Sequence, residues 1–509
     1  MVKILNLEKT LQSHFGLSSF RPLQREIIEA VMHEKDVLAM LPTGAGKSLC
    51  YQLPTYLKQG STLIVSPLVS LMEDQVQQLR MIGEKHVIAF NSFLSYRDKR
   101  IATHQLSNYK FIFASPEMLQ NSFFINALQQ LNITLFVVDE AHCISQWGHD
   151  FRPDYLRLGE VRQQLGEPTC LALTASATPR VLDDIKERLC LHNPSSFYTN
   201  IDRPNIAMLV EKVDSLDDKI TKALSYCRVL EGPGIIYFSS RSWCERFTAL
   251  LEKDKSVAFY HAGMEHSERK LVQQQFINNQ LDVICATSAF GMGVNKNNVR
   301  YVIHFHYPYQ LESYLQEIGR AGRDGEPSVA ITLITKGDEQ LASSLIHQDL
   351  PNENQLLAVL SEINGNASSQ LTKERERIYQ IQFQLSETGW RFIRYHLREQ
   401  HVVDENDIIQ LFELDELYQY LVNQIIARQK DKQYKLQAMH EWLFNSSECR
   451  RAQLVAYFQG ELQSKPKYCC DTCQPIPLDE FSSPSNQKPE WGNWLDELKA
   501  LLLHGHVEA

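Results

Sequence analysis

Short runs of consecutive apolar residues alternate with stretches of helical periodicity over the first two thirds of the chain. The first series of such runs occupies residues 37–40, 63–65, 111–113, 135–138 and 171–173. The second series occupies residues 235–238, 257–260, 283–286, 301–303 and 329–333. Continuous apolarity is typical of parallel strands that are covered on both faces. The pattern therefore predicts two α/β parallel sheets in tandem, joined near residues 200–205.

After about residue 340 the strand-type runs fade. Trp390, Ile393 and Leu397 share a helical face, whereas residues 381–385 alternate like a strand, and together they predict a helix-rich module that could be a winged helix. Apolar stripes at 436–443 and 454–458 predict two packed helices. Prolines and serines indicate a linker at 474–490, and residues 491–504 predict a short amphipathic helix.

Composition places the chain among globular proteins with several domains. Of its 509 residues 43% are hydrophobic and 22% charged, which excludes bulk disorder and fibrous repeats. No apolar run approaches the ~18 residues that a membrane-spanning helix needs. The net charge of −10 argues against unspecific coating of nucleic acid but leaves room for a local basic groove. The N-terminal residues do not resemble a signal peptide, so we expect a cytoplasmic protein without membrane contact.

Four of the eleven cysteines lie close together near the C-terminal end: Cys449, Cys469, Cys470 and Cys473. The other seven are scattered singly, often within apolar runs, and indicate buried thiols. In a chain without a secretion signal, such a cluster favours a metal site over a disulfide framework.

A glycine-rich segment follows directly on the first predicted strand and precedes a helical stretch. Its residues are Thr43, Gly44, Ala45, Gly46, Lys47 and Ser48. Glycines let backbone N–H groups turn towards phosphate oxygens, and the helix N-terminus adds the positive end of its dipole. Lys47 would reach the β- and γ-phosphates of a nucleotide, and Ser48 would offer its hydroxyl to Mg²⁺. The usual pattern has glycine where this chain has Leu41, and a chance turn is the alternative.

Two further groups point to the same chemistry. Asp139 and Glu140 end a predicted strand, where one carboxylate can hold Mg²⁺ and its neighbour can activate the attacking water; a solvated acidic turn is the alternative. Arg320 and Arg323, three apart and flanked by glycines, are expected on one helix face, from which they could supply charge to the γ-phosphate of ATP. A phosphate loop in one domain and such arginines in the next predict a cleft that ATP closes.

The order of these motifs resembles that of superfamily 2 helicases with a DEAH box. The matching segments are 15–16, 20–24, 43–48, 66–68, 115–117 and 139–142. Residues 141–153, AHCISQWGHDFRP, resemble the aromatic-rich loop of the RecQ family of DNA helicases, and residues 289–293 also resemble that family. The likeness covers about residues 10–335 and 435–473. It implies two tandem RecA-like domains followed by a helical zinc-binding module, and ATP-driven unwinding of DNA with 3′→5′ polarity in recombination and repair.

The resemblance also implies roles for single residues. Arg21 and Gln24 would recognise adenine, and residues 43–48 would bind the phosphates. Asp139 would hold Mg²⁺, Glu140 would act on water, and His142 would couple hydrolysis to movement. Arg320 and Arg323 would be transition-state arginines, with Arg323 as the finger.

Single-stranded DNA would contact Trp147, Phe151 and Arg152 of the aromatic-rich loop. Aromatic faces stack bases without sequence preference, and arginine adds phosphate and cation–π contacts. Core packing is the alternative for the two aromatic residues. Asn295 stands where the family has a carboxylate, which could alter the coupling between the two domains.

The zinc module departs from the family pattern as well. Cys449 fits the helical start and Cys470 with Cys473 fits the closing pair, but the remaining ligand would be Cys469, directly adjacent to Cys470. Four thiolates around a structural Zn²⁺ are the favoured interpretation. Three cysteines completed by a histidine such as His440 are the alternative.

The expected domains are 1–204 and 205–342 for the two RecA-like units, 343–427 for the helix-rich insertion, 428–476 for the zinc platform and 477–509 for the linker and last helix. Arg428, Lys430, Lys432 and Lys435 could contact duplex phosphates or form a solvated helix face. Expected partners are single-stranded DNA, forked DNA and a single-stranded-DNA-binding protein. We expect the chain to act as a monomer in the bacterial cytoplasm, associated with the nucleoid. An RNA-directed helicase and an inactive DNA-binding scaffold are the alternatives.

Overall fold

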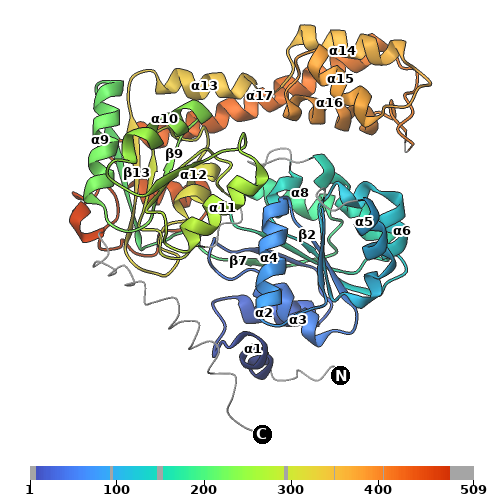
Figure 1. Cartoon of the computed structure of the whole chain (residues 1–509), viewed down its shortest axis with the longest axis horizontal. Helices are drawn as coiled ribbons and strands as arrows, with labels where there is room; N and C mark the ends of the chain where they lie inside the picture. Colours follow the sequence, from blue (N-terminus) through green and yellow to red (C-terminus); the bar gives the residue numbers. More distant parts are fainter. Residues whose placement is uncertain are drawn as a thin grey trace.

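The computed structural model describes residues 7–91, 96–145, 153–291, 296–348, 350–404 and 406–481. Within these residues the chain forms two α/β lobes, and a long helical arm extends from the second lobe across the first (Figure 1). Trp147, Phe151, Arg152, Asn295 and the predicted helix at 491–504 lie outside the described residues. In the part of the chain that is described, no helix is long and apolar enough to cross a membrane.

Lobe 1 is built on a seven-stranded parallel sheet with the strand order β3-β4-β2-β5-β6-β1-β7. Its strands are β1 (Val37–Met40), β2 (Ser61–Val65), β3 (Val87–Phe90), β4 (Phe111–Ala114), β5 (Ile133–Val138), β6 (Thr169–Thr174) and β7 (Ser195–Tyr198). Its helices are α1 (Leu7–Phe15), α2 (Gln24–Met32), α3 (Leu49–Leu57), α4 (Val69–Met81), α5 (Tyr96–His104), α6 (Ser122–Leu128), α7 (Leu158–Gln164) and α8 (Pro179–Arg188). Short 3₁₀ helices are η1 (Leu106–Asn108), η2 (Met118–Gln120), η3 (Ala141–Ile144) and η4 (Pro153–Arg157). Val37 and Ala39 enter one core while Leu38 and Met40 enter another, which explains the continuous apolarity of β1.

Lobe 2 repeats this design with a six-stranded parallel sheet in the order β10-β11-β9-β12-β13-β8. Its strands are β8 (Ile206–Lys212), β9 (Gly234–Tyr237), β10 (Val257–Tyr260), β11 (Val283–Ala286), β12 (Tyr301–His304) and β13 (Ser328–Ile334). Its helices are α9 (Leu216–Val229), α10 (Arg241–Leu251), α11 (His266–Ile277) and α12 (Leu311–Ile318). The two tandem parallel-sheet lobes expected from the sequence are confirmed.

The arm begins with α13 (Asp338–Gln348) and carries a three-helix module of α14 (Glu353–Gly365), α15 (Lys373–Gln382) and α16 (Glu387–Glu399). Isolated antiparallel bridges join Gln370 to Ile408 and Val403 to Ile409. The helix-rich module expected after lobe 2 is thus present, and its identification as a winged helix stays a prediction. The strand expected at 381–385 is wrong, because α15 runs to Gln382 and Gln384 then turns the chain with a left-handed φ of 49°.

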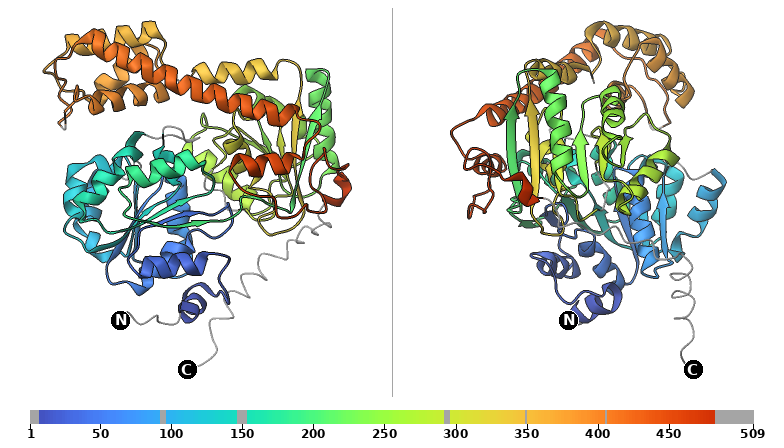
Figure 2. Two further views of the ribbon diagram at one scale, coloured as in Figure 1. Left: turned by 180° about the vertical axis from the view of Figure 1, so that it is seen from behind. Right: turned by 60° about the vertical axis from the view of Figure 1, so that its left-hand side comes forward.

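Helix α17 (Leu414–Phe444) is continuous over 31 residues, about 46 Å, and therefore crosses position 427 without a break. Its first half packs into the core of the three-helix module through Leu417, Leu421 and Ile425. Its second half packs on lobe 2 through residues that include Met439 and Trp442. Figure 2 shows this helix in orange, spanning from the module to lobe 2.

Lys432 and Lys435 lie on the inner side of α17, so they do not form the duplex-contacting face that we considered. Both side chains are buried, and the Lys432 ammonium lies 5.7 Å from the ring centre of Tyr309. Lys435 is paired with Asp431 at 3.2 Å and lies 4.0 Å from Glu312 of α12. These lysines fasten α17 to lobe 2.

The zinc platform follows α17 with α18 (Arg450–Tyr457) and an irregular segment that returns to lobe 2. Residue 470 pairs with Met208 of β8, so this segment extends the edge of the second sheet. A 3₁₀ helix, η5 (Leu478–Phe481), ends the described chain, and Phe481 is buried in the core of lobe 2. The first residues of the expected linker are therefore packed against the protein.

Candidate nucleotide site and zinc centre

The loop between β1 and α3 places the predicted phosphate-binding residues at the carboxyl end of the lobe 1 sheet. Gly44 and Gly46 have left-handed φ angles of 84° and 76°. A Cβ atom on Gly46 would lie 2.6 Å from Nε2 of Gln24, and one on Gly44 would lie 3.3 Å from Cγ of Arg323. Both positions therefore favour glycine because of the backbone angle, and a side chain there would in addition crowd Gln24 or Arg323.

Leu41 stands where the usual pattern has glycine. Its side chain is fully buried, and its N–H donates to the carbonyl of Thr174 in β6 at 3.0 Å. The residue thus continues the pairing of β1 with β6 and precedes the turn, so its position does not require glycine.

Arg21 and Gln24 hold the phosphate loop from the side. Gln24 Nε2 donates to the carbonyls of Ala45 at 2.9 Å and Gly46 at 3.0 Å, while its Oε1 accepts from the N–H of Arg21 at 2.9 Å. The Arg21 guanidinium donates to the carbonyl of Gly44. The structure brings both residues to the loop, and adenine recognition by them stays a prediction.

The acidic pair lies just beyond β5, next to the loop. Lys47 Nζ is 3.3 Å from Oε1 of Glu140, which adopts a left-handed φ of 47°. Burial and the neighbouring charge of Glu140 raise the pKa of Asp139 to about 6, and Lys47 opposes this rise. Because a divalent cation would stabilise the ionised form of this buried carboxylate, the donor set of Asp139 and Ser48 fits a hard cation such as Mg²⁺.

His142 connects the acidic pair with β6. Its Nδ1 lies 3.1 Å from Oγ1 of Thr174 and 3.4 Å from Oε2 of Glu140. Oγ1 of Thr174 donates in turn to the carbonyl of Ser176 at 3.1 Å. A chain of polar contacts therefore leads from Glu140 to the segment after β6.

The arginines of lobe 2 reach this site across the interlobe cleft. The Thr43 hydroxyl donates to the carbonyl of Gly319 at 2.9 Å, and the aliphatic part of the Arg323 side chain lies against Gly44. Arg320 is buried beside Tyr237. The expected helix face is wrong, because α12 ends at Ile318 and both arginines lie in the turn that follows.

Positive charge accumulates at this turn. Burial, Arg320 and Arg203 lower the pKa of Arg323 to about 9, and Tyr237 and Glu140 only partly offset them. Buried positive groups that converge on a phosphate loop define a site for a polyanion. Arg203 was not identified from the sequence, where an Arg-Pro pair between two sheets gives no signal of chemistry.

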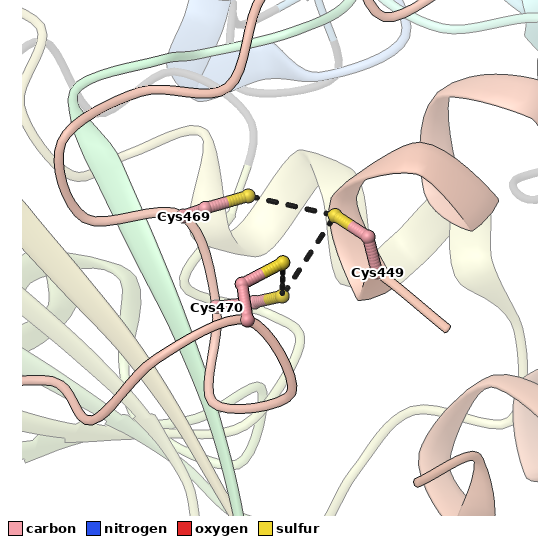
Figure 3. Close-up of side chains that lie close together, drawn as sticks. Cys449, Cys469 and Cys470 are labelled. Atoms are coloured by element: carbon pink, nitrogen blue, oxygen red, sulfur yellow. Dashed lines mark hydrogen bonds between the residues drawn. The ribbon is translucent and has the colours of Figure 1, made fainter. Parts of the chain in front are cut away.

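The cysteine cluster lies where α18 meets the segment that pairs with β8. Figure 3 shows Cys449, Cys469 and Cys470 turned towards one another. The Sγ–Sγ distances are 3.5 Å for Cys449 and Cys469, 3.9 Å for Cys449 and Cys470, and 3.5 Å for Cys470 and Cys473.

All four sulfur atoms lie within 4.8 Å of one another. A tetrahedron with Zn–S bonds of about 2.3 Å has edges of about 3.8 Å, so the set fits zinc although two of its members are adjacent. His440 is not part of this set, and its Nε2 lies 3.2 Å from the hydroxyl of Tyr307.

The aromatic-rich loop is described only at its two ends. On one side the Ser145 hydroxyl donates to Asp184. On the other side the Tyr155 hydroxyl donates to the carbonyl of Asp139 at 3.2 Å. One end of the loop is thus attached to α8, and the other is attached to Asp139 of the acidic pair.

Fold and site together define a two-lobed helicase motor. Residues 21–185 match the DEAD/DEAH box helicase domain, residues 212–325 the helicase conserved C-terminal domain, and residues 402–474 the RecQ zinc-binding domain. The chain is 40% identical to the probable ATP-dependent DNA helicase RecS of Bacillus subtilis (strain 168), over 97% of this chain and 98% of that protein. The chain belongs to the RecQ family of ATP-dependent DNA helicases.

Other relatives and solved structures match a smaller share of this chain. The ATP-dependent DNA helicase RecQ of Pasteurella multocida (strain Pm70) is 41% identical over 64% of this chain, which spans 52% of that protein. The Mycobacterium smegmatis helicase Lhr bound to single-stranded DNA matches in fold with a TM-score of 0.56 and 16% identity, over 82% of this chain and 62% of that chain. Dbp5 of S. cerevisiae bound to RNA matches with a TM-score of 0.54 and 17% identity, over 67% and 89%. The fold alone therefore does not distinguish DNA from RNA as substrate.

Proposed function

We propose that the chain hydrolyses Mg-ATP between its two lobes and uses this cycle to move 3′→5′ along single-stranded DNA and to unwind duplexes. The observation that carries the proposal is the position of Arg323 of lobe 2 against Gly44 in the phosphate loop of lobe 1. A site assembled from two bodies is complete only when they are closed, so its occupancy controls their relative position.

The contacts of Lys47 support its role in the cycle. Its ammonium group is paired with Glu140 at 3.3 Å. The phosphates of ATP would draw Lys47 away, and Glu140 would then be free to accept a proton from the attacking water. Arg320 and Arg323 would bind the charge that develops on the transferred phosphoryl group. Asp139 and Ser48 would hold Mg²⁺, which supplies positive charge to the phosphate oxygens when it is bound.

The polar contacts of His142 support a coupling role. Departure of Lys47 would change the charge next to Glu140, and His142 would pass this change to Thr174 and Ser176. Ser145, before the aromatic-rich loop, donates to Asp184 of α8, and Tyr155, after the loop, donates to the carbonyl of Asp139. Because one of these anchors is part of the acidic pair, we propose that Trp147, Phe151 and Arg152 of the loop engage single-stranded DNA in step with hydrolysis.

The zinc cluster is proposed as a structural site of four cysteines. Because a closed tetrahedral shell leaves no position for substrate, the ion would hold α18 and the segment at β8 together. Family membership supports DNA as substrate and roles in recombination and repair.

A hydrolysis assay and an unwinding assay test the proposal. ATP turnover is measured without nucleic acid, with single-stranded DNA and with single-stranded RNA, and Lys47→Ala serves as the inactive control. We expect stimulation by DNA and none in the control. Unwinding is then measured on duplexes with only a 3′ tail or only a 5′ tail, and the 3′-tailed duplex should be opened. Stronger stimulation by RNA would reject the DNA assignment, and preference for the 5′-tailed duplex would reject the polarity.

A further inference from the structure

The linker between the two sheets carries an arginine that binds both halves of the nucleotide site. Nη1 of Arg203 donates to the carbonyls of Thr43 in the phosphate loop at 3.3 Å and of Gly319 at 3.2 Å. Its Nη2 donates to the carbonyls of Ala321 at 3.1 Å and Gly322 at 2.6 Å. One guanidinium thus bridges the lobe 1 loop and the lobe 2 turn that presents Arg320 and Arg323.

A second arginine, from the zinc platform, holds the linker from behind. Arg451 is fully buried. Its Nη1 lies 2.5 Å from Oδ1 of Asp202 and donates to the carbonyl of Arg203 at 2.9 Å. Its Nη2 donates to the carbonyl of Ile206 and, at 3.4 Å, to that of the zinc-cluster residue Cys469.

We infer that Arg203 is a positioning residue for the arginine finger and that Arg451 holds it in place from the zinc platform. The N–H groups of the turn after α12 are bonded to backbone carbonyls, for example that of Ala321 to Ile318 at 3.0 Å, and three of the turn's own carbonyls accept from Arg203. The planar guanidinium fixes the direction of each of these bonds, which the single ammonium group of a lysine cannot do. Displacement of a catalytic group by about 1 Å can cost about 10²-fold in rate.

The zinc platform is also bound to lobe 2 directly beside this linker. Besides the bonds of Arg451, the N–H of Met208 in β8 donates to the carbonyl of Cys469 at 3.2 Å, and the N–H of Asp471 donates to that of Met208 at 2.9 Å. The cysteine segment and the linker are therefore tied to the same stretch of β8. The cysteine cluster is therefore connected to the turn that carries Arg323 through two residues, Arg451 and Arg203.

The test measures kcat for ATP in the presence of single-stranded DNA and, separately, the Kd of a fluorescent ATP analogue. For Arg203→Lys we expect kcat to fall about 10- to 100-fold, with Kd changed less than about threefold. The matched control is Arg162→Lys. Arg162 is a buried arginine of lobe 1 that is paired with Asp36 at 2.8 Å, at the end of β1 away from the phosphate loop. This control should lose thermal stability and keep kcat.

A double-mutant cycle distinguishes positioning from general damage. If Arg203 acts through Arg323, then Arg203→Lys combined with Arg323→Ala should turn over no more slowly than Arg323→Ala alone. Independent effects, which multiply in the double variant, would overturn the inference. So would a normal kcat in Arg203→Lys when Arg323→Ala is impaired.

Arg451→Lys tests the zinc-platform half of the relay. We expect a loss of kcat of the same kind at unchanged zinc content, and a normal kcat in this folded variant would overturn the role of Arg451. The inference rests on the proposed finger role of Arg323. If Arg323→Ala itself kept full kcat, the proposed function would fail at that residue and the inference with it.

Discussion

Removal of the positive charge of Arg323 should stabilise the nucleotide-free protein while it abolishes turnover. The surroundings of this side chain disfavour its charge, since burial, Arg320 and Arg203 lower its pKa from 12.5 to about 9. At neutral pH the guanidinium is still charged, and a charge that the folded state disfavours reduces the free energy of unfolding. Arg323→Met removes the charge and keeps an apolar chain that can cover Gly44.

The size of the effect follows from the pKa. The difference between 12.5 and 9 corresponds to about 5 kcal/mol, which is an upper bound because the protein around the variant relaxes. We expect a gain of about 1–3 kcal/mol in the free energy of unfolding. For lobes of this size the melting temperature should rise by about 2–10 °C.

Two measurements on the same preparation test this prediction. Thermal unfolding without nucleotide should show the higher melting temperature, and addition of a non-hydrolysable ATP analogue should stabilise the variant less than the wild type. Turnover with single-stranded DNA should fall by about 10³-fold or more. Arg228→Met provides the control, because Arg228 is exposed and its ion pair is with the surface residue Asp254. Both quantities should stay near the wild-type values.

A lower melting temperature in Arg323→Met would refute the electrostatic reasoning, since it would mean that the charge stabilises the empty site. Unchanged turnover with a higher melting temperature would leave the electrostatics intact and exclude Arg323 as the finger. The two outcomes separate the energetic argument from the catalytic one.

Three further predictions concern other parts of the molecule. Cys469→Ser should reduce bound zinc from one ion per chain to substoichiometric levels after dialysis, as metal analysis would show. Thermal unfolding should show a lower melting temperature. Full retention of zinc would favour a site of three cysteines. Without Mg²⁺ and nucleotide, Asp139→Asn should raise the free energy of unfolding at pH 7 by about 1–3 kcal/mol, because the buried carboxylate with a pKa of about 6 is ionised at a cost there. The gain should vanish towards pH 4, where that carboxyl is protonated in the folded state, and a gain independent of pH would contradict this cause. Glycine at the exposed positions 430 and 433 of α17 should destabilise the helix by about 1 kcal/mol each. We expect this change to impair unwinding more than DNA-stimulated hydrolysis, whereas alanine at the same positions should change neither activity.

The continuous apolar runs predict ten of the described strands, because a parallel strand covered on both faces is mostly apolar. They miss β3, β7 and β8, which are only partly buried. The sequence also predicts the phosphate loop and the acidic pair, since their chemistry allows few residue types and both follow directly on strands. The glycines that flank Arg320 and Arg323 indicate the end of a helix rather than its continuation. Gly319 ends α12, where a Cβ would lie 2.7 Å from Oγ1 of Thr43, and Gly322 has a left-handed φ of 55°.

Other features depend on tertiary contacts that leave no local pattern. The role of Arg203 exists only because the linker passes between the phosphate loop and the arginine turn. Residues 381–385 are too few to separate a strand from a helix end by alternation alone. Lys432 and Lys435 lie four residues before the buried Leu436 and Met439, so the helical period did place them on the inner face. Their charge suggested solvent exposure. Asp431 is a partner of Lys435 within the same helix, whereas Glu312 of α12 is supplied by the fold.

The arrangement of α17 links the arm to the nucleotide cleft. One end of this helix is fixed to lobe 2, and the other carries the three-helix module, which meets lobe 1 around a cavity of about 220 Å³. The cavity is lined by Ile144 and Leu156 from lobe 1 and by Tyr395 and His396 from α16. A single rigid helix cannot follow both lobes when the cleft between them changes. In the proposed cycle, movement of the lobes would therefore be taken up at this contact between the module and lobe 1, where Ile144 and Leu156 line the cavity.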